Sequence, residues 1–144
     1  MALSRKAALG VIGSAAAAFV AVAPGTAHAD DGLFGSLAMS VEANGDVLVG
    51  WGADYSNWSD SDARALRECG NSRCQVVVQF NNACGAIARN GDGKLGRAWG
   101  KTRAEAERLA VADAGPVNMP LINLGSSAPK APKILASECT SNAR

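Results

Sequence analysis

Alternating hydrophobic and polar residues predict a β-hairpin in the region that follows residue 34. Apolar side chains occupy every second position over residues 37–41 and again over residues 47–51, which is the period of a strand with one buried face. Asn44-Gly45 lies between the two segments. This pair predicts a tight turn with positive φ at both central positions.

Two stretches with helical spacing follow, one ending at Cys69 and one ending at Ala114. Each begins with a capping-box pair and ends before a glycine. The pairs are Ser59 with Asp62 and Thr102 with Glu105, and the glycines are Gly70 and Gly115. The predicted buried faces carry Ala63, Leu66 and Cys69 in the first helix, and Ala106, Leu109, Ala110 and Ala114 in the second. The small alanines permit close approach of helix to sheet.

The same order of features occurs twice, which indicates an internal duplication. Phe34, the Asn44-Gly45-Asp46 turn and Trp51-Gly52 precede the first helix. Cys84, the Asn90-Gly91-Asp92 turn and Trp99-Gly100 precede the second. Repeat one covers about residues 34–80 and repeat two about residues 84–139, with Trp51 and Trp99 as equivalents and Arg97 in the place of Val49.

Each repeat is expected to close with a strand. In repeat one this strand spans residues 73–80, with Cys74, Val76, Val78 and Phe80 on one face. In repeat two an irregular loop with four prolines, residues 116–133, precedes a last strand at residues 133–139, and residues 121–124 form at most a short extended piece. We therefore expect an α+β fold in which about six short strands form an antiparallel sheet with two helices on one face.

Residues 1–29 have the three parts of a secretory signal peptide. Arg5 and Lys6 precede an apolar run over residues 7–23, and Ala27-His28-Ala29 supplies the cleavage pattern. The alternative is a membrane anchor, but the run is shorter than the roughly 20 residues that a span needs. We expect cleavage after Ala29, which leaves residues 30–144 as a single domain.

Charge excludes some classes of partner. The full chain carries a formal charge of +1, and removal of Arg5 and Lys6 leaves −1. No basic cluster remains to bind phosphate backbones, so nucleic acid is not an expected partner. No second apolar run is long enough to span a bilayer, so no stable membrane insertion is expected after cleavage.

Four cysteines in a small exported chain predict two disulfides. Zinc is the competing interpretation, but one close cysteine pair without a second pair or a histidine fits it poorly. Four cysteines allow three pairings. We favour Cys69–Cys74, which closes the turn after the first helix, and Cys84–Cys139, which ties the last strand to the second hairpin. Cys74–Cys84 with Cys69–Cys139 remains the alternative.

Few residues are candidates for catalysis. The one histidine, His28, belongs to the expected signal peptide, so no Ser-His-Asp triad is available. Asp54, Asp60 and Asp62 lie near Tyr55 and Trp58, which is a composition found in glycosidases. Helix capping explains these carboxylates more simply. No catalytic residue, cofactor or metal is therefore expected.

Two further motifs have simple structural explanations. The stretch Asn90-Gly91-Asp92-Gly93-Lys94 resembles a calcium loop, but its fifth position is a lysine, and a hairpin turn explains it better. Trp51 and Trp99 are expected in the core. Trp58 lies between polar residues, so Tyr55 and Trp58 form the candidate binding surface.

Several of these motifs together resemble DUF4189, a family of small exported bacterial proteins, common in actinobacteria, with no established activity. The motifs are Cys-Gly-x3-Cys-x-Val-Val (Cys69 to Val77), Asn-x-Cys-Gly-Ala-Ile-Ala (Asn82 to Ala88), Trp99-Gly100 and Thr-Arg-Ala-Glu-Ala-Glu (Thr102 to Glu107). The resemblance covers residues 34–115, and Cys139 matches the closing cysteine. The chain departs from the family at Ala114, where a cysteine is frequent, and in the proline-containing loop.

The sequence thus predicts an exported, disulfide-bonded interaction domain that is not an enzyme. It is expected outside the cell or in the cell envelope, with an unknown protein or a cell-wall polymer as its partner. The alternatives are an enzyme that acts on cell-wall glycans through its carboxylates and a purely structural envelope protein.

Overall fold

The structure, a computed structural model, describes residues 32–117 and 130–143. These residues form six strands and two helices, which confirms the α+β class and its duplicated order of elements. The elements are β1 (Phe34–Val41), β2 (Val47–Tyr55), α1 (Trp58–Cys69), β3 (Gln75–Asn81), β4 (Cys84–Arg89), β5 (Leu95–Gly100), α2 (Arg103–Ala114) and β6 (Lys133–Cys139). The last strand therefore forms where the sequence predicted it. The expected signal peptide, residues 1–29, and the extended piece at 121–124 lie outside the described residues.

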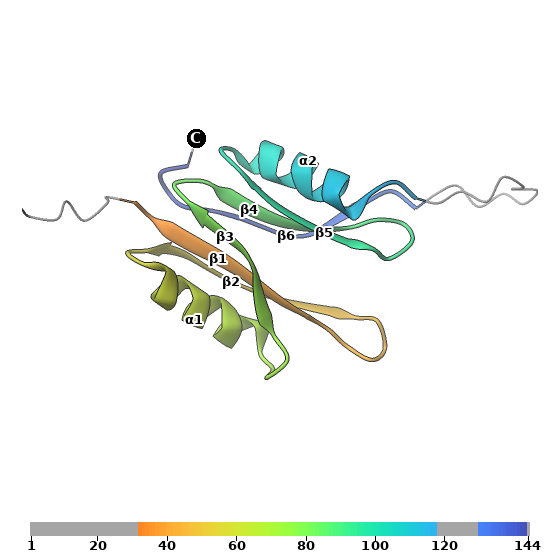
Figure 1. Ribbon diagram of the computed structural model, residues 1–144, viewed down its shortest axis with the longest axis horizontal. Coiled ribbons are helices and arrows are strands. Elements are labelled where there is room, and N and C mark those ends of the chain that lie inside the picture. Colours follow the sequence, from red (N-terminus) through yellow and green to blue (C-terminus); the bar gives the residue numbers. More distant parts are fainter. Residues whose placement is uncertain (1–31, 118–129, 144) are drawn as a thin grey trace, which may run out of the picture.

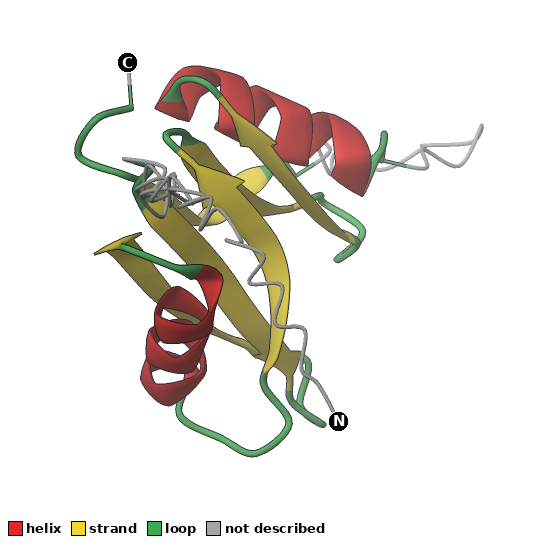
Figure 2. Ribbon diagram, turned by 60° about the vertical axis from the view of Figure 1, so that its left-hand side comes forward, coloured by secondary structure: helices red, strands yellow, loops and turns green. Residues whose placement is uncertain are grey.

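The six strands are divided between two antiparallel sheets, with orders β2-β1-β3 and β5-β4-β6. Helix α1 packs on β1 and β2, and α2 packs on β4 and β5. Figures 1 and 2 show the two sheets face to face, with one helix on the outer side of each. The sequence predicted one sheet of about six strands with both helices on one face, and this part of the prediction is wrong. The strands form two sheets that bury one face against each other, and each sheet carries one helix on its other face, which gives four layers.

The central layer is a hydrophobic core between the sheets. Leu37 from β1, Val78 and Phe80 from β3, and Ile87 from β4 form its buried centre. Between each sheet and its helix lies one further cluster, which consists only of alanine and cysteine among its buried residues. Large side chains therefore fill the space between the sheets, and small ones bring each helix close to its sheet.

Matching irregularities in strand pairing support the duplication. In the first sheet the register shifts between Leu37 and Ala38, and in the second it shifts between Ile87 and Ala88. The pairings Ala38–Gly50 and Ala88–Gly96 are likewise equivalent. A β-bulge at the same place in both repeats indicates that the two sheets have the same construction.

This register corrects the predicted equivalence of two tryptophans. Trp51 pairs with Leu37, whereas Trp99 pairs with Gly85. The structural equivalent of Trp51 is Arg97, which pairs with Ile87. The sequence comparison was misled because Trp-Gly occurs in both strands at positions that differ by two residues.

The same bulge changes the predicted faces of β3. Val76 pairs with Ala38 and packs under α1, whereas Val78 pairs with Leu37 and faces the other sheet. Strict alternation had placed both valines on one face. The extra residue, Val77, shifts the alternation, which is the usual consequence of a bulge.

Helix α1 begins two residues earlier than predicted and turns a different face inward. Its cap is Asn57, whose side chain accepts from the Asp60 N–H, so Ser59 is not the cap. Ser61, Ala65 and Cys69 are buried, while Leu66 is exposed. Small residues face the sheet because the backbone of β2 lies against this helix.

Helix α2 and the two C-terminal glycines agree more closely with the sequence. Thr102 caps α2 and accepts from the Glu105 N–H, and its inward residues are Ala106, Ala110 and Ala114. Gly70 has the predicted left-handed conformation. Gly115 also has positive φ but an extended ψ, so it is not a left-handed cap.

Both predicted hairpin turns form, but with one positive-φ glycine each instead of two positive-φ residues. Gly45 and Gly93 occupy the left-handed position, and each donates to the carbonyl three residues earlier, Glu42 and Asn90. This is a type I turn followed by a left-handed residue. A turn, rather than an EF-hand loop, therefore accounts for residues 90–94.

Asn90 fastens the second turn to the end of α2. Its amide oxygen accepts from the Asp92 and Lys94 N–H groups, and its amide nitrogen donates to the Ala114 carbonyl at 3.0 Å. Asn90 is buried, whereas Asn44 in the first repeat is exposed and bonds to Asp46 within its own turn. The second turn is thus part of the packed structure.

The structure contains both disulfides that the sequence favoured, Cys69–Cys74 and Cys84–Cys139. The first links the end of α1 to the residue before β3. The second joins residues that pair directly across β4 and β6, 55 positions apart in sequence. It therefore holds the C-terminal strand in the second sheet.

Candidate functional site

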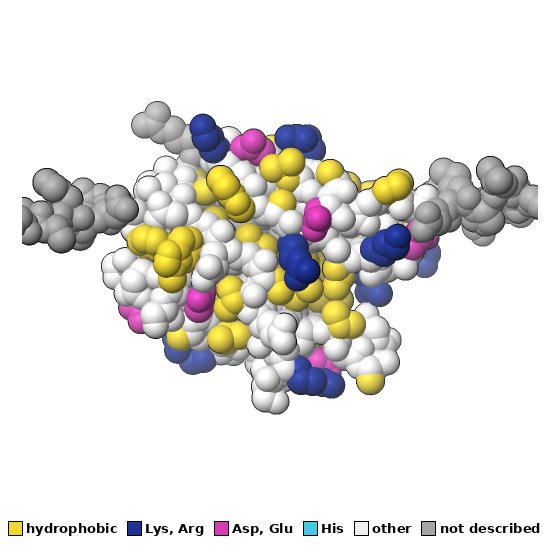
Figure 3. Space-filling view, viewed as in Figure 1, with side chains coloured by type: hydrophobic (Ala, Val, Ile, Leu, Met, Phe, Trp, Pro, Cys, Tyr) yellow, Lys and Arg dark blue, Asp and Glu magenta, His cyan; other side chains and the backbone are white. Residues whose placement is uncertain are grey.

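Three aromatic side chains gather at the end of the molecule where β1 begins and β2 ends. Phe34 pairs with Tyr55 across β1 and β2. Trp58, the first residue of α1, packs edge-to-face on Phe34 with 4.6 Å between ring centroids. Trp58 is 37% exposed, and the other two side chains are half-buried. We call Phe34, Tyr55 and Trp58 the aromatic patch; Figure 3 shows hydrophobic side chains at this end of the molecule.

A bulge in β2 positions Tyr55 within the patch. The register of β1 with β2 shifts between Phe34 and Ser36. Within this shift Asp54 has a φ of 65°, a conformation that Asp adopts more readily than most residues. The Asp54 carboxylate accepts from the Ser141 N–H at 2.7 Å. The extra residue brings Tyr55 opposite Phe34, and bulges are common where a side chain is re-aimed near a functional site.

The cap of α1 holds Trp58 in place. The Asn57 side chain accepts from the Asp60 N–H at 2.9 Å and donates to the Asp60 carboxylate at 2.8 Å. Ser61, one turn into the helix, donates to the Trp58 carbonyl at 3.0 Å. These hydrogen bonds hold the first turn of α1, which carries Trp58.

Phe34 links the two residues that the sequence singled out, because it pairs with Tyr55 across the strands and its ring packs on Trp58. Phe34 was missed because it lies 21 residues before Tyr55 and was assigned only to a strand. Each of the three predicted carboxylates accepts hydrogen bonds from different protein groups. Asp54 accepts from Ser141, Asp60 accepts from Asn57, and Asp62 accepts from Ser36 and Gln79.

A polar network with two buried serines lies between α1 and the first sheet. The hydroxyl oxygens of Ser36 and Ser61 are 2.9 Å apart, and Ser36 donates to Asp62. Gln79 on β3 donates to both oxygens of Asp62, at 3.1 and 2.8 Å. Ala86 and Ala106 occupy the positions of the two serines in the second repeat. The network therefore distinguishes the repeats at the end that carries the patch.

Trp51 and Trp99 are surface residues, which corrects their predicted place in the core. They are 44% and 58% exposed. Both lie on strands at a sheet edge, β2 and β5. A large ring at an edge is covered on one side only, and sequence periodicity does not distinguish an edge strand from a central one.

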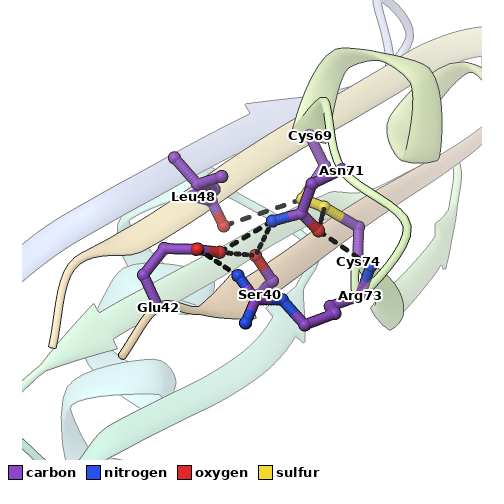
Figure 4. The surroundings of a disulfide bond; sticks show 7 residues. All are labelled: Ser40, Glu42, Leu48, Cys69, Asn71, Arg73 and Cys74. Carbon is purple, nitrogen blue, oxygen red and sulfur yellow. Dashed lines mark hydrogen bonds and ion pairs between the residues drawn. A yellow bond between two sulfur atoms is a disulfide. The ribbon is translucent and has the colours of Figure 1, made fainter. Parts of the chain in front are cut away.

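A second polar cluster surrounds the Cys69–Cys74 disulfide, as Figure 4 shows. Glu42 accepts from Ser40 at 2.9 Å, from Asn71 at 2.7 Å and from Arg73. These hydrogen bonds, chiefly that from Ser40, together with the Arg73 charge, lower the pKa of Glu42 below its ordinary value. The cluster joins the first hairpin to the loop after α1.

Residues 32–117 and 130–143 contain neither a cluster of potential metal ligands nor a helix that could cross a membrane. This part of the chain places no three His, Cys, Asp or Glu side chains together as a metal site. Within the same ranges, neither helix has the length and hydropathy needed to cross a bilayer.

Together, these features define a small, disulfide-linked α+β domain built from two similar halves, with an aromatic patch at one end. Residues 34–118 match the model of a family described as a domain of unknown function, DUF4189, and the chain belongs to that family. The expected resemblance is thereby confirmed.

Mycobacterial proteins also resemble part of the chain. Protein Rv1269c of Mycobacterium tuberculosis and Protein Mb1300c of Mycobacterium bovis are each 38% identical to it over 58 residues. The aligned stretch covers 40% of this chain and 43% of each relative, so the chain spans less than half the length of the relatives it matches. No solved structure matches the chain.

Proposed function

We propose that the protein is an exported recognition domain that binds a cell-envelope polysaccharide through the aromatic patch without altering it chemically. The observation that carries this proposal is the partly exposed Trp58 ring, which packs on Phe34 at the capped start of α1. Aromatic rings offer a large contact area with few rotatable bonds, and their flat faces suit the apolar faces of sugar rings.

The scaffold supports this proposal. Two disulfides suit a protein that works in an oxidising compartment. Asp54, Asn57 and Asp60 lie within four residues of Tyr55 or Trp58 and provide polar groups beside the rings. A few polar groups next to an apolar surface are typical of a site that orients its ligand.

The carboxylates favour binding over catalysis. Glycoside hydrolysis needs two carboxyl groups on either side of the scissile bond. Asp54, Asp60 and Asp62 are each bonded to other parts of the protein. We therefore propose that they maintain the shape of the site and that the protein has no hydrolase activity.

The experiment measures binding of the purified, oxidised protein to insoluble mycobacterial cell-wall polysaccharide by co-sedimentation. Trp58→Ala should reduce binding at least about tenfold, since central aromatic contacts contribute about 2 kcal/mol or more. Leu66→Ala is the matched control, because Leu66 lies on the same helix and is also 37% exposed. It should bind like the unchanged protein.

Equal loss of binding in both variants, or none in either, would contradict the proposal. The supernatant is also analysed by mass spectrometry for released sugars. Release that disappears in Asp60→Asn or Asp62→Asn, with the fold intact by circular dichroism, would establish the enzyme alternative instead.

A further inference from the structure

A hollow lies beside the turn between β4 and β5, at the opposite end of the molecule from the aromatic patch. Its volume is about 470 Å³. Arg89, Asn90, Asp92, Lys130 and Lys133 contribute to its lining. Three of these side chains are cationic and one is anionic, so the lining carries a formal charge of +2.

The segment at Lys130 packs closely against Gly91 in the wall of this hollow. A Cβ atom on Gly91 would lie 2.5 Å from the Lys130 carbonyl oxygen, so glycine allows the segment at Lys130 to approach the turn. Asn90 fixes the turn through hydrogen bonds to its own backbone and to the end of α2. The hollow is therefore preformed on ordered backbone.

Two of the cations stand directly opposite each other. Arg89 pairs with Lys133 across β4 and β6. Like charges at directly opposed positions destabilise a sheet. Neither of the ion pairs found among residues 32–117 and 130–143 involves Arg89, Lys130 or Lys133. A bound anion would remove this repulsion.

The first hairpin supports the Arg89 side chain. One guanidinium nitrogen of Arg89 donates to the Gly45 carbonyl at 3.1 Å. A guanidinium has five N–H donors in a fixed plane, so this bond orients the group and leaves donors for an oxyanion. The turn of the first repeat has Val41 and Glu42 where the second has Arg89 and Asn90, so the cationic lining is specific to the second repeat.

We propose that this hollow binds a phosphate group, either free or as a phosphate monoester. A doubly charged phosphate matches the +2 lining, and arginine together with lysine is a usual combination for phosphate binding. This site lies at the turns, whereas the aromatic patch lies where β1 begins, so the two sites are independent.

Titration calorimetry with inorganic phosphate, glucose 6-phosphate and glucose tests the proposal on the full oxidised protein. Lys130→Gln and Lys133→Gln should each weaken phosphate binding about three- to fivefold, as expected for a partly exposed charge interaction. Lys101→Gln, an exposed lysine before α2, is the matched control and should change nothing. Asp92→Asn should strengthen binding, because it removes the negative charge from the lining.

Similar affinity for phosphate and glucose 6-phosphate would support a site for the phosphate group alone. Tighter binding of the ester would support a site that also contacts the sugar. The proposal is overturned if neither ligand shows saturable binding, if glucose binds as tightly as its phosphate, or if Lys101→Gln weakens binding as much as Lys133→Gln. Circular dichroism confirms that each variant is folded.

Discussion

Glycine residues determine how closely each helix approaches its sheet. A Cβ atom on Gly50 would lie 2.1 Å from the Ala65 carbonyl oxygen, and one on Gly96 would lie 2.1 Å from the Ala110 carbonyl oxygen. Both glycines face small helix residues, and both pair with an alanine of the central strand. The sequence shows the alanines of the helices, but not that strand glycines complete the contact, because this needs the register.

Gly50→Ala and Gly96→Ala should therefore each destabilise the protein. The added methyl group meets helix backbone, which cannot move aside as a flexible side chain can, so we expect a loss of about 1–3 kcal/mol for overpacking. Urea unfolding followed by circular dichroism measures it. An unchanged free energy of unfolding in both variants would refute the account of helix packing.

The stability of the protein should depend on pH through Glu42. Its pKa is lowered from 4.5, first by the Ser40 hydrogen bond and also by the Asn71 and Arg73 contacts. A group with a lowered folded-state pKa stabilises the protein above its unfolded pKa, and this stabilisation disappears as the pH falls through the folded-state value.

Glu42→Gln should therefore be less stable than the unchanged protein near neutral pH, and the difference should shrink below about pH 4.5. Urea unfolding near neutral pH and at about pH 3 checks this expectation. Ser72→Ala, at an exposed position in the adjacent loop, serves as the control and should show no such pH-dependent difference. A difference that is constant with pH would contradict the role given to the Glu42 carboxylate.

At the scale of elements, the two disulfides stabilise different parts of the fold. Cys69–Cys74 spans five positions and closes a short loop, whereas Cys84–Cys139 spans 55 positions and holds β6 beside β4. In the chain-entropy account, the bridge that closes the longer loop stabilises the protein by about 4 kcal/mol, and the bridge that closes the shorter loop stabilises it by about 2 kcal/mol.

Replacing both cysteines of one bridge by serine tests this difference. The Cys84→Ser, Cys139→Ser protein should lose about 2 kcal/mol more stability than the Cys69→Ser, Cys74→Ser protein. Hydrogen exchange should also show earlier opening of β6. Equal losses with unchanged protection of β6 would show that the strand does not depend on its bridge.

Most elements were predictable because their information is local. Hairpin turns, the Thr102 cap and the strand at residues 133–139 each follow from neighbouring residues. The start of α1 could not be predicted, because Asn57 and Ser59 are both good N-cap residues. Which of them caps the helix depends on which face of α1 packs on the sheet. The inward face of β3 was missed because a bulge depends on the partner strand.

At the scale of the whole molecule, the duplication was visible in the sequence but the layering was not. Six strands of this pattern fit one sheet or two, and the division follows from Leu37, Phe80 and Ile87 meeting between the sheets. The aromatic patch, like the layering, depends on contacts between residues that are distant in the sequence. Tyr55 and Trp58 are close in sequence and could be singled out together, whereas Phe34 reaches them only through strand pairing and ring packing.

In the function that we propose, Trp58 and its neighbours form the surface that recognises the ligand. The chain has three tryptophans, so the indole N–H signals in a proton–nitrogen correlation spectrum report separately on Trp51, Trp58 and Trp99. On addition of a solubilised mycobacterial cell-wall polysaccharide, the Trp58 signal should shift with saturation while the other two remain in place. An unmoved Trp58 signal together with a saturable shift of Trp51 or Trp99 would contradict the account.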